Sequence, residues 1–174
     1  MCAQITVLGT CHNVQGAERW HGRKLDDTQY RVVLERLVDE SDFVFEEATG
    51  LGPTTAERLS APRLGAGQYL DLDPPLDQRF AFGLAERTGD QSPIDPCDPN
   101  TDFCNSELVD PHARRENLWL HTIEEKTFDN GLLVCGFLHT LSMSFRLQSV
   151  GYTVRAFHYM PWNKFCQRRH FEEE

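Results

Sequence analysis

Four short apolar runs along the chain have the composition of strands. They cover residues 3–8, 43–45, 132–135 and 152–157. Short segments that are rich in valine, isoleucine, leucine and phenylalanine are typical of strands in the interior of a protein. The third run is apolar at every position, as expected for a parallel strand that is covered on both faces. We therefore expect one strand from each of these runs.

Longer segments carry apolar residues at the spacing of an amphipathic helix. The clearest covers residues 26–39, where apolar side chains recur every three or four positions along one face. Asp110 suits the start of a helix over 110–128, and Gly151 suits the end of a helix over 138–150. These three segments are predicted to be the main helices.

The middle of the chain carries a weaker pattern. We expect short helices over residues 55–59 and 76–87, and a loop over the proline-, aspartate- and cysteine-rich residues 93–105. The resulting order is β-α-β, an insert, and then α-β-α-β. Because a strand, a helix and a second strand in this order form a right-handed parallel unit, the order predicts an α/β fold.

The predicted architecture is a mostly parallel central sheet that is flanked by helices. We expect a single domain over residues 1–160, with residues 55–108 as a helical and loop insert. Residues 161–174 are predicted to form a polar C-terminal tail. A chain of 174 residues is long enough to bury a real core without cross-links.

The charge of the chain indicates which kinds of binding partner are unsuitable. The chain has 17 basic and 27 acidic residues, a formal net charge of −10, and this balance argues against a nucleic acid or an anionic membrane as partner. No apolar run approaches the ~20 residues that a membrane-spanning helix needs, and the first residues do not resemble a signal peptide. None of the six cysteines forms a CxxC pair. We expect a cytoplasmic protein with free thiols.

Two segments share one design, in which a strand is followed by glycine, two further residues and a histidine. Gly9 and His12 belong to the first segment, and Gly136 and His139 belong to the second. Glycine permits a sharp exit from a strand, so each histidine is expected just beyond a carboxyl strand end. Glu46 occupies the comparable place after the second strand. In open α/β sheets, ligands bind in the crevice beyond these strand ends.

His12, Glu46 and His139 are therefore the predicted site. Two imidazoles and a carboxylate can hold a catalytic divalent metal with an open coordination position. The same three groups can instead act as general acid and base without a metal. Either histidine could also have a purely structural role, such as bonding a backbone carbonyl. Glu46 could likewise only form a buried ion pair with Arg115.

These motifs resemble those of the TraB/Tiki superfamily, which includes erythromycin esterase-like and ChaN-like proteins. The two Gly-x-x-His segments match its paired GxxH motifs, and residues 42–46 look like its strand-borne glutamate. Arg115, with Glu116 and Asn117, is similar to its helix motif, in which an arginine faces the site. Residues 132–154 resemble its last motif in order and spacing.

The resemblance implies two kinds of function, because the superfamily includes metal-dependent peptidases, esterases and a haem-binding lipoprotein. The first is hydrolysis of an amide or ester bond in a small-molecule or peptide substrate, with Mn, Co or Zn held by His12, Glu46 and His139. The second is a non-catalytic module that binds or senses a ligand such as haem. A third option, which does not come from the resemblance, is an interaction protein of the toxin, immunity or defence type in which this site is silent. A homodimer is one option for its oligomeric state.

Further residues are assigned to catalysis and substrate binding. Arg115 is expected to stabilise an anionic substrate group or a developing oxyanion, because its guanidinium suits bidentate anion recognition. Glu47 should point to the opposite face of the strand from Glu46. The remaining candidates for substrate binding are Arg114, Asn13 and His21, the last two in a loop that flanks His12.

Overall fold

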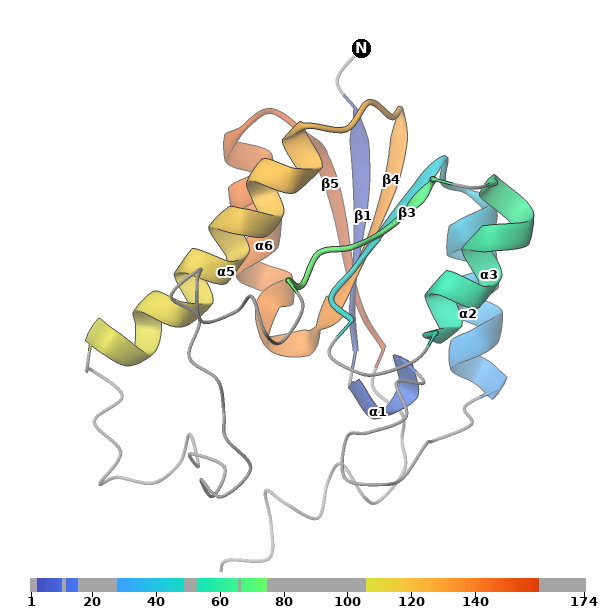
Figure 1. Ribbon diagram of the computed structural model, residues 1–174, viewed down its shortest axis with the longest axis horizontal. Helices are drawn as coiled ribbons and strands as arrows, with labels where there is room; N and C mark the ends of the chain where they lie inside the picture. The colour runs from blue at the N-terminus through green and yellow to red at the C-terminus, as the bar shows by residue number, and fades with distance from the viewer. Residues whose placement is uncertain are drawn as a thin grey trace, which may run out of the picture.

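One parallel sheet organises the chain, with helices on both of its faces (Figure 1). The computed structural model describes residues 3–10, 12–15, 28–48, 53–65, 67–74 and 106–159. The strands in this part are β1 (Gln4–Thr10), β2 (Phe43–Glu46), β3 (Tyr69–Asp71), β4 (Asn130–Gly136) and β5 (Thr153–Tyr159). Their spatial order is β3-β2-β4-β1-β5, and every neighbouring pair is parallel.

The three central strands end at nearly the same level. Thr10 at the end of β1 pairs with Gly136 at the end of β4, and Glu46 at the end of β2 pairs with Val134. The chain segments that follow these strands therefore leave the sheet at one edge. This edge is the place where an α/β sheet binds its ligands.

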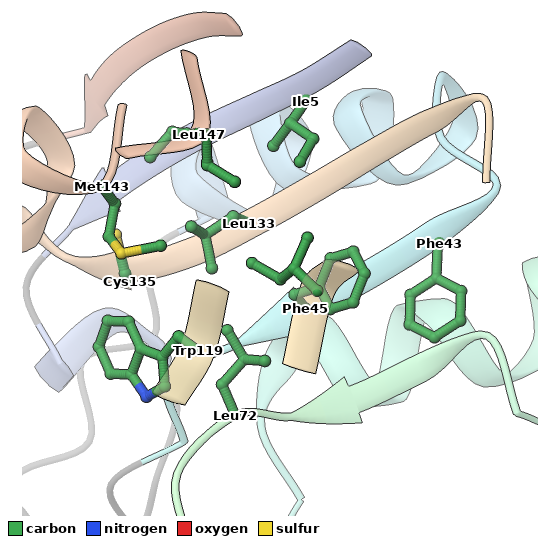
Figure 2. Close-up of a cluster of buried hydrophobic side chains, with 11 residues drawn as sticks. Ile5, Phe43, Phe45, Leu72, Trp119, Leu133, Cys135, Met143 and Leu147 are labelled. Carbon is green, nitrogen blue, oxygen red and sulfur yellow. The ribbon is translucent and has the colours of Figure 1, made fainter. Parts of the chain in front are cut away.

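One face of the sheet is covered by α5 (Ser106–Glu124) and α6 (Thr140–Ser149), which follows the short 3-10 helix η1 (Phe137–His139). Alternate residues of each strand point to this face, because side chains alternate along a strand. Figure 2 shows how Trp119 of α5 and Met143 of α6 pack with these strand residues. The buried members of this cluster are Ile5, Val7, Phe43, Phe45, Leu72, Trp119, Ile123, Leu133, Cys135, Met143 and Leu147.

The other face carries α1 (His12–Gln15), α2 (Thr28–Asp39) and α3 (Thr55–Leu64). Leu34 and Val38 of α2 and Leu59 of α3 pack against Val44 and Val134 of the strands. The intervening strand residues thus form a second apolar layer. The sheet is sandwiched between helices, and both faces of β1, β2 and β4 are buried.

The predicted α/β fold with a mostly parallel sheet is confirmed. The pattern missed β3, since its three residues are too few to show a periodicity and two of them are only partly buried. The helix expected over residues 138–150 begins two residues later, because residues 137–139 form η1. The helix expected over 55–59 continues to Leu64, although Pro62 lies within it.

Other expectations fall outside the described residues. These are the helix over residues 76–87, the loop over 93–105 and the tail over 161–174. In the part of the chain that is described, no helix is long and apolar enough to cross a membrane.

Candidate functional site

The pleat of β2 separates its two terminal carboxyl groups. Glu46 and Glu47 are adjacent and both are fully buried, with 0% exposure. Glu46 continues the row of Val44 and points to the face of α2 and α3, whereas Glu47 continues the row of Phe45 and points to α5 and α6. The alternation predicted for these two residues is therefore present. It places Glu47, and not Glu46, on the side of Arg115 and His139.

In the described part of the chain, Glu47 contacts Gly136, Arg115 and His139. The Gly136 N–H donates to its Oε2 at 2.6 Å, which ties the side chain to the end of β4. The Arg115 Nη2 atom lies 2.8 Å from Oε1, and the His139 Nε2 atom lies 3.9 Å from the same oxygen. Glu47 thus has one oxygen bonded to the backbone and the other directed at a guanidinium and an imidazole.

Arg115 bridges two buried carboxylates. Its Nε donates to Asp73 Oδ1 at 2.7 Å and its Nη2 bonds Asp73 Oδ2, while the same Nη2 faces Glu47. Trp119 also donates to Asp73, and the Arg115 guanidinium lies 4.9 Å from the centre of the Trp119 ring. Burial opposes the charge, but Glu47 and Asp73 outweigh it and raise the pKa of Arg115 above its ordinary value. The geometry favours positioning of Glu47 over substrate binding as the role of Arg115.

His139 is held by a carboxylate on its Nδ1 side. The Nδ1 atom lies 2.8 Å from Glu116 Oε1, and the Trp119 ring meets the imidazole edge-on at 5.0 Å between centres. Glu116 also accepts from Ser142 Oγ at 2.5 Å and from Arg146 Nε at 2.9 Å. Burial alone would raise the pKa of Glu116, but the bonds from His139, Ser142 and Arg146 lower it below its ordinary value. An ionised Glu116 can only accept, so the Nδ1–H tautomer suits this contact, and in that tautomer Nε2 carries the lone pair.

The two Gly-x-x-His segments pack directly against each other. A Cβ atom at Gly9 would lie 1.8 Å from the Thr140 hydroxyl and 2.9 Å from the His158 ring. Thr140 follows His139 and begins α6. The absence of a side chain at Gly9 therefore lets the start of α6 approach β1, which sets the height of His139 above the sheet.

The other residues that were predicted for the site are only partly described by the structure, or are exposed. His12 and Asn13 begin α1, two and three residues beyond the end of β1, but their side chains lie outside the described part. His21 lies outside the described residues altogether. Arg114 is exposed on α5, whereas Glu116, two residues further along the helix, is buried.

Glu46 forms a separate buried cluster across the sheet. The Tyr69 hydroxyl donates to its Oε2 at 2.8 Å, and the Thr54 hydroxyl donates to the same oxygen. Among the described residues, Oε1 has no hydrogen-bond partner. Burial raises the pKa of Glu46 from 4.5 to about 8, against the lowering effect of the Thr54 and Tyr69 bonds. The pKa of Tyr69 is also raised, first by burial and then by Glu46.

Thr54 serves both this cluster and the start of α3. Its Oγ1 accepts from the Glu57 N–H at 3.0 Å, which caps the helix, while its own proton goes to Glu46. The Glu46 carboxyl thus has a structural role, because it is buried and bonds the residue that caps α3. Its hydrogen bonds go to Thr54 and Tyr69, on the face of the sheet opposite to His139 and Arg115.

The site residues fit a divalent cation in donor chemistry. An imidazole nitrogen with its other nitrogen bound to a carboxylate, next to a carboxylate oxygen, is a common pair of ligands for zinc. His139 Nε2 and Glu47 Oε1 provide such a pair at 3.9 Å. Within the described residues, however, no three histidine, cysteine, aspartate or glutamate side chains come together as a metal site. A third protein ligand would have to come from outside these described side chains, and His12 is the one that the sequence predicts.

A surface hollow of about 300 Å³ lies elsewhere, at the amino ends of β2 and β4. Asp42, Phe128 and Asp129 line it with Gln68 and Thr127. The Asp42 carboxylate already accepts the backbone N–H groups of Asp129 and Asn130. The Asp42 carboxylate therefore stabilises the turn before β4.

Four groups of the site, three buried carboxylates and the partly exposed Arg146, were missed by sequence reasoning. Glu47 was set aside in favour of Glu46, although strand alternation already placed the two on opposite faces. Glu116 was quoted only as a neighbour of Arg115, and its position one residue along α5 turns it towards α6. Asp73 and Arg146 carried no signal, since each is recognisable only by its partner in space.

Comparisons with known proteins add no family to this geometry. No protein-family model matches the chain, and no curated protein sequence matches it.

Proposed function

We propose that the chain is a hydrolase of ester or amide bonds that uses His139 as its base, with Glu47 beside it. One observation carries the proposal. The Nδ1 side of His139 is bound to a buried, ionised glutamate, and its Nε2 side faces a second carboxylate at the carboxyl edge of the sheet. This arrangement orients an imidazole for proton transfer in the way that a carboxylate–histidine pair does in hydrolases.

The roles follow from the contacts. His139 Nε2 accepts a proton from water, whose oxygen attacks the carbonyl carbon, and the imidazolium then protonates the leaving group. Glu116 stabilises the imidazolium and holds the ring in one orientation. Glu47 accepts a hydrogen bond from the attacking water on the other side. Arg115 keeps Glu47 in place and offsets part of its charge.

In the alternative, metal-bound form, a divalent cation of the zinc, manganese or cobalt type would be held by Glu47 and His139, with His12 as the third ligand that the first Gly-x-x-His segment suggests. His139 Nε2 would then be a ligand and not the base, and Glu47 would also have to serve as the acceptor for the proton of water. When bound, such a cation would polarise the carbonyl and acidify water. Glu116 would then hold the far nitrogen of the ligand His139, which is the usual arrangement for a metal-bound histidine. Glu47 therefore replaces Glu46 in the proposed ligand set.

The test is activity on a panel of nitrophenyl esters and fluorogenic peptide amides, with and without a chelator. We expect His139→Ala and Glu47→Gln to lower kcat/KM roughly 100-fold or more. Glu46→Gln is the matched control, because it changes an equally buried neighbour on the opposite face. Wild-type rates in both His139→Ala and Glu47→Gln would refute the proposal. Loss of activity with chelator, and its return with zinc, manganese or cobalt, would assign the metal-bound form.

Metal content gives a readout that needs no substrate. If the cation is resident, plasma mass spectrometry of reconstituted protein should find near one metal per chain. Glu47→Gln and His139→Ala should lower this content and Glu46→Gln should not. Equal metal content in all three variants would exclude Glu47 and His139 as ligands.

A further inference from the structure

Among the described strands, β5 lies at the end of the sheet, and its outer edge has no partner strand there. In the described part of the chain β5 has one strand neighbour, β1, and it stands at the end of the sheet. The Thr153 N–H donates to the Ala3 carbonyl at 3.0 Å, so the backbone groups of Thr153 and of every second residue after it point to β1. Those of Val154, Ala156 and His158 therefore point outward. Such a row of backbone groups is a template for a further strand.

An exposed apolar stripe on α6 lies beside this edge. Leu141 and Phe145 are 67% and 64% exposed, and they lie one helical turn apart, so that they form one apolar stripe. Each comes one residue before Ser142 or Arg146, and both of these contact α5 through Glu116. Successive residues of a helix are turned by about 100°. Met143 and Leu147 face the sheet, and Ser142 and Arg146 face α5. Leu141 and Phe145 therefore lie on the remaining side of α6, which is the side of the β5 edge.

Charge sets this surface apart from the rest of the chain. No aspartate or glutamate occurs from residue 130 to residue 159, although the whole chain has 27 acidic residues and a net charge of −10. In the described part of the chain, α6 and β5 therefore contribute no carboxylate that would repel another copy. Two such surfaces can approach each other while the acidic parts of both copies stay apart.

We propose that a second copy of this chain binds here, as a two-fold dimer in which the β5 strands pair antiparallel. A two-fold axis through Ala156 and perpendicular to the sheet joins the outward backbone groups of the two copies, with Val154 opposite His158. It keeps both α6 helices on the same side of one continuous sheet. Leu141 and Phe145 of the two copies then pack against each other above the strand pair, which buries the exposed stripe.

The side chains near this axis suit a two-fold arrangement. Ala156 is small, so the two copies can meet at the axis without overlap. Arg155 lies over the ring of Phe157 within one chain, at 5.4 Å from its centre. The same axis sets Arg155 of one copy opposite Phe157 of the other, so the cation–π contact can be made across the strand pair as well. The contact is isologous, and the open edge closes on itself.

The first test is the mass of the full chain in solution by light scattering after size-exclusion chromatography, from ~1 to ~200 µM loaded protein, a span around the micromolar affinity of weak interfaces. We expect a species of twice the 20.0 kDa chain mass at high concentration. Leu141→Glu/Phe145→Glu should shift the dimer–monomer midpoint at least 100-fold. Val32→Glu is the matched control, because Val32 is an exposed apolar residue on α2 and is 60% exposed. This variant should dimerise like the wild type.

A second variant tests the strand pairing itself. Ala156→Pro removes an outward N–H and leaves the bonds to β1 intact, so the chain should fold and be monomeric. Ala156→Cys should give a disulfide-linked dimer on mild oxidation, since residues on a hydrogen-bonded antiparallel pair have Cα atoms about 5.5 Å apart. Val32→Cys should not. A wild type that stays monomeric at every concentration would overturn the proposal. So would a dimer that survives both Leu141→Glu/Phe145→Glu and Ala156→Pro, because another surface would then hold it.

Discussion

The buried carboxyl of Glu46 should make the stability of this protein fall as the pH rises. Its pKa is raised from 4.5 to about 8, because burial disfavours the charged form more than the Thr54 and Tyr69 hydroxyls favour it. The folded state therefore holds this proton more tightly than the unfolded state does. The stabilising contribution is complete below pH 4.5 and is lost as the pH rises to about 8.

The size of the effect follows from the same two values. At about 1.4 kcal/mol per pH unit, a change in pKa from 4.5 to about 8 corresponds to at most about 5 kcal/mol of unfolding free energy. That is a large part of the 5–15 kcal/mol by which domains are typically stable. Glu46→Gln keeps an oxygen that can accept from Thr54 and Tyr69 but carries no titrating proton. It should remove most of this dependence.

The assay is urea unfolding followed by circular dichroism at several pH values from 5 to 9. We expect the wild type to lose stability relative to Glu46→Gln across this range, so that the variant is the less or equally stable protein at pH 5 and the more stable one at pH 9. Glu47→Gln is the control on the opposite face, and it should be less stable than the wild type throughout, because it removes the partner of Arg115. Parallel stability curves for the wild type and Glu46→Gln would refute the reasoning.

Three further predictions follow from packing and charge. Gly9→Ala should destabilise the fold by about 1–3 kcal/mol, because its Cβ would lie 1.8 Å from the Thr140 hydroxyl, and a thermal-melt double-mutant cycle with Thr140→Gly should recover part of the loss. Arg115→Ala should cost about 3–5 kcal/mol by leaving Asp73 and Glu47 buried without a counter-charge, whereas Arg114→Ala on the exposed side should change the unfolding free energy by less than ~0.5 kcal/mol. Glu116→Gln should lower kcat about 10- to 100-fold while circular dichroism stays unchanged, and an unaltered kcat would show that the Nδ1 bond does not position His139 for catalysis.

The fold could be predicted because its main elements carry strong local signals. β4 is apolar at each position from Leu132 to Cys135, and this pattern belongs to a strand buried on both faces. The apolar residues of α2 recur every three or four positions, and this spacing belongs to an amphipathic helix. β3 gave no such signal, since its three residues owe their conformation to pairing with β2 rather than to their own pattern.

The candidate site could be predicted only as far as its backbone. Gly136 and His139 pointed to a turn at a strand end, and the structure has one there. The side chains around His139 could not be predicted, because Glu116 meets Ser142 and Arg146 only through the packing of α5 on α6. Choosing between Glu46 and Glu47 required knowing which face of β2 each helix covers. Alternation separates the two carboxyls but does not say which of them faces the histidine.

The position of β1 in the sheet has a consequence for how the chain folds. This first strand is central, and its two neighbours come from the far end of the sequence, since Gln4 pairs with Asn130 and with Thr153. During synthesis, both edges of β1 stay unpaired until β4 and β5 have left the ribosome, which is almost the whole described chain. Contacts that are so distant in sequence are closed late and slowly. We therefore expect folding on a timescale of roughly milliseconds to seconds, and chain fragments that end before β4 should expose β1 to aggregation or to chaperones.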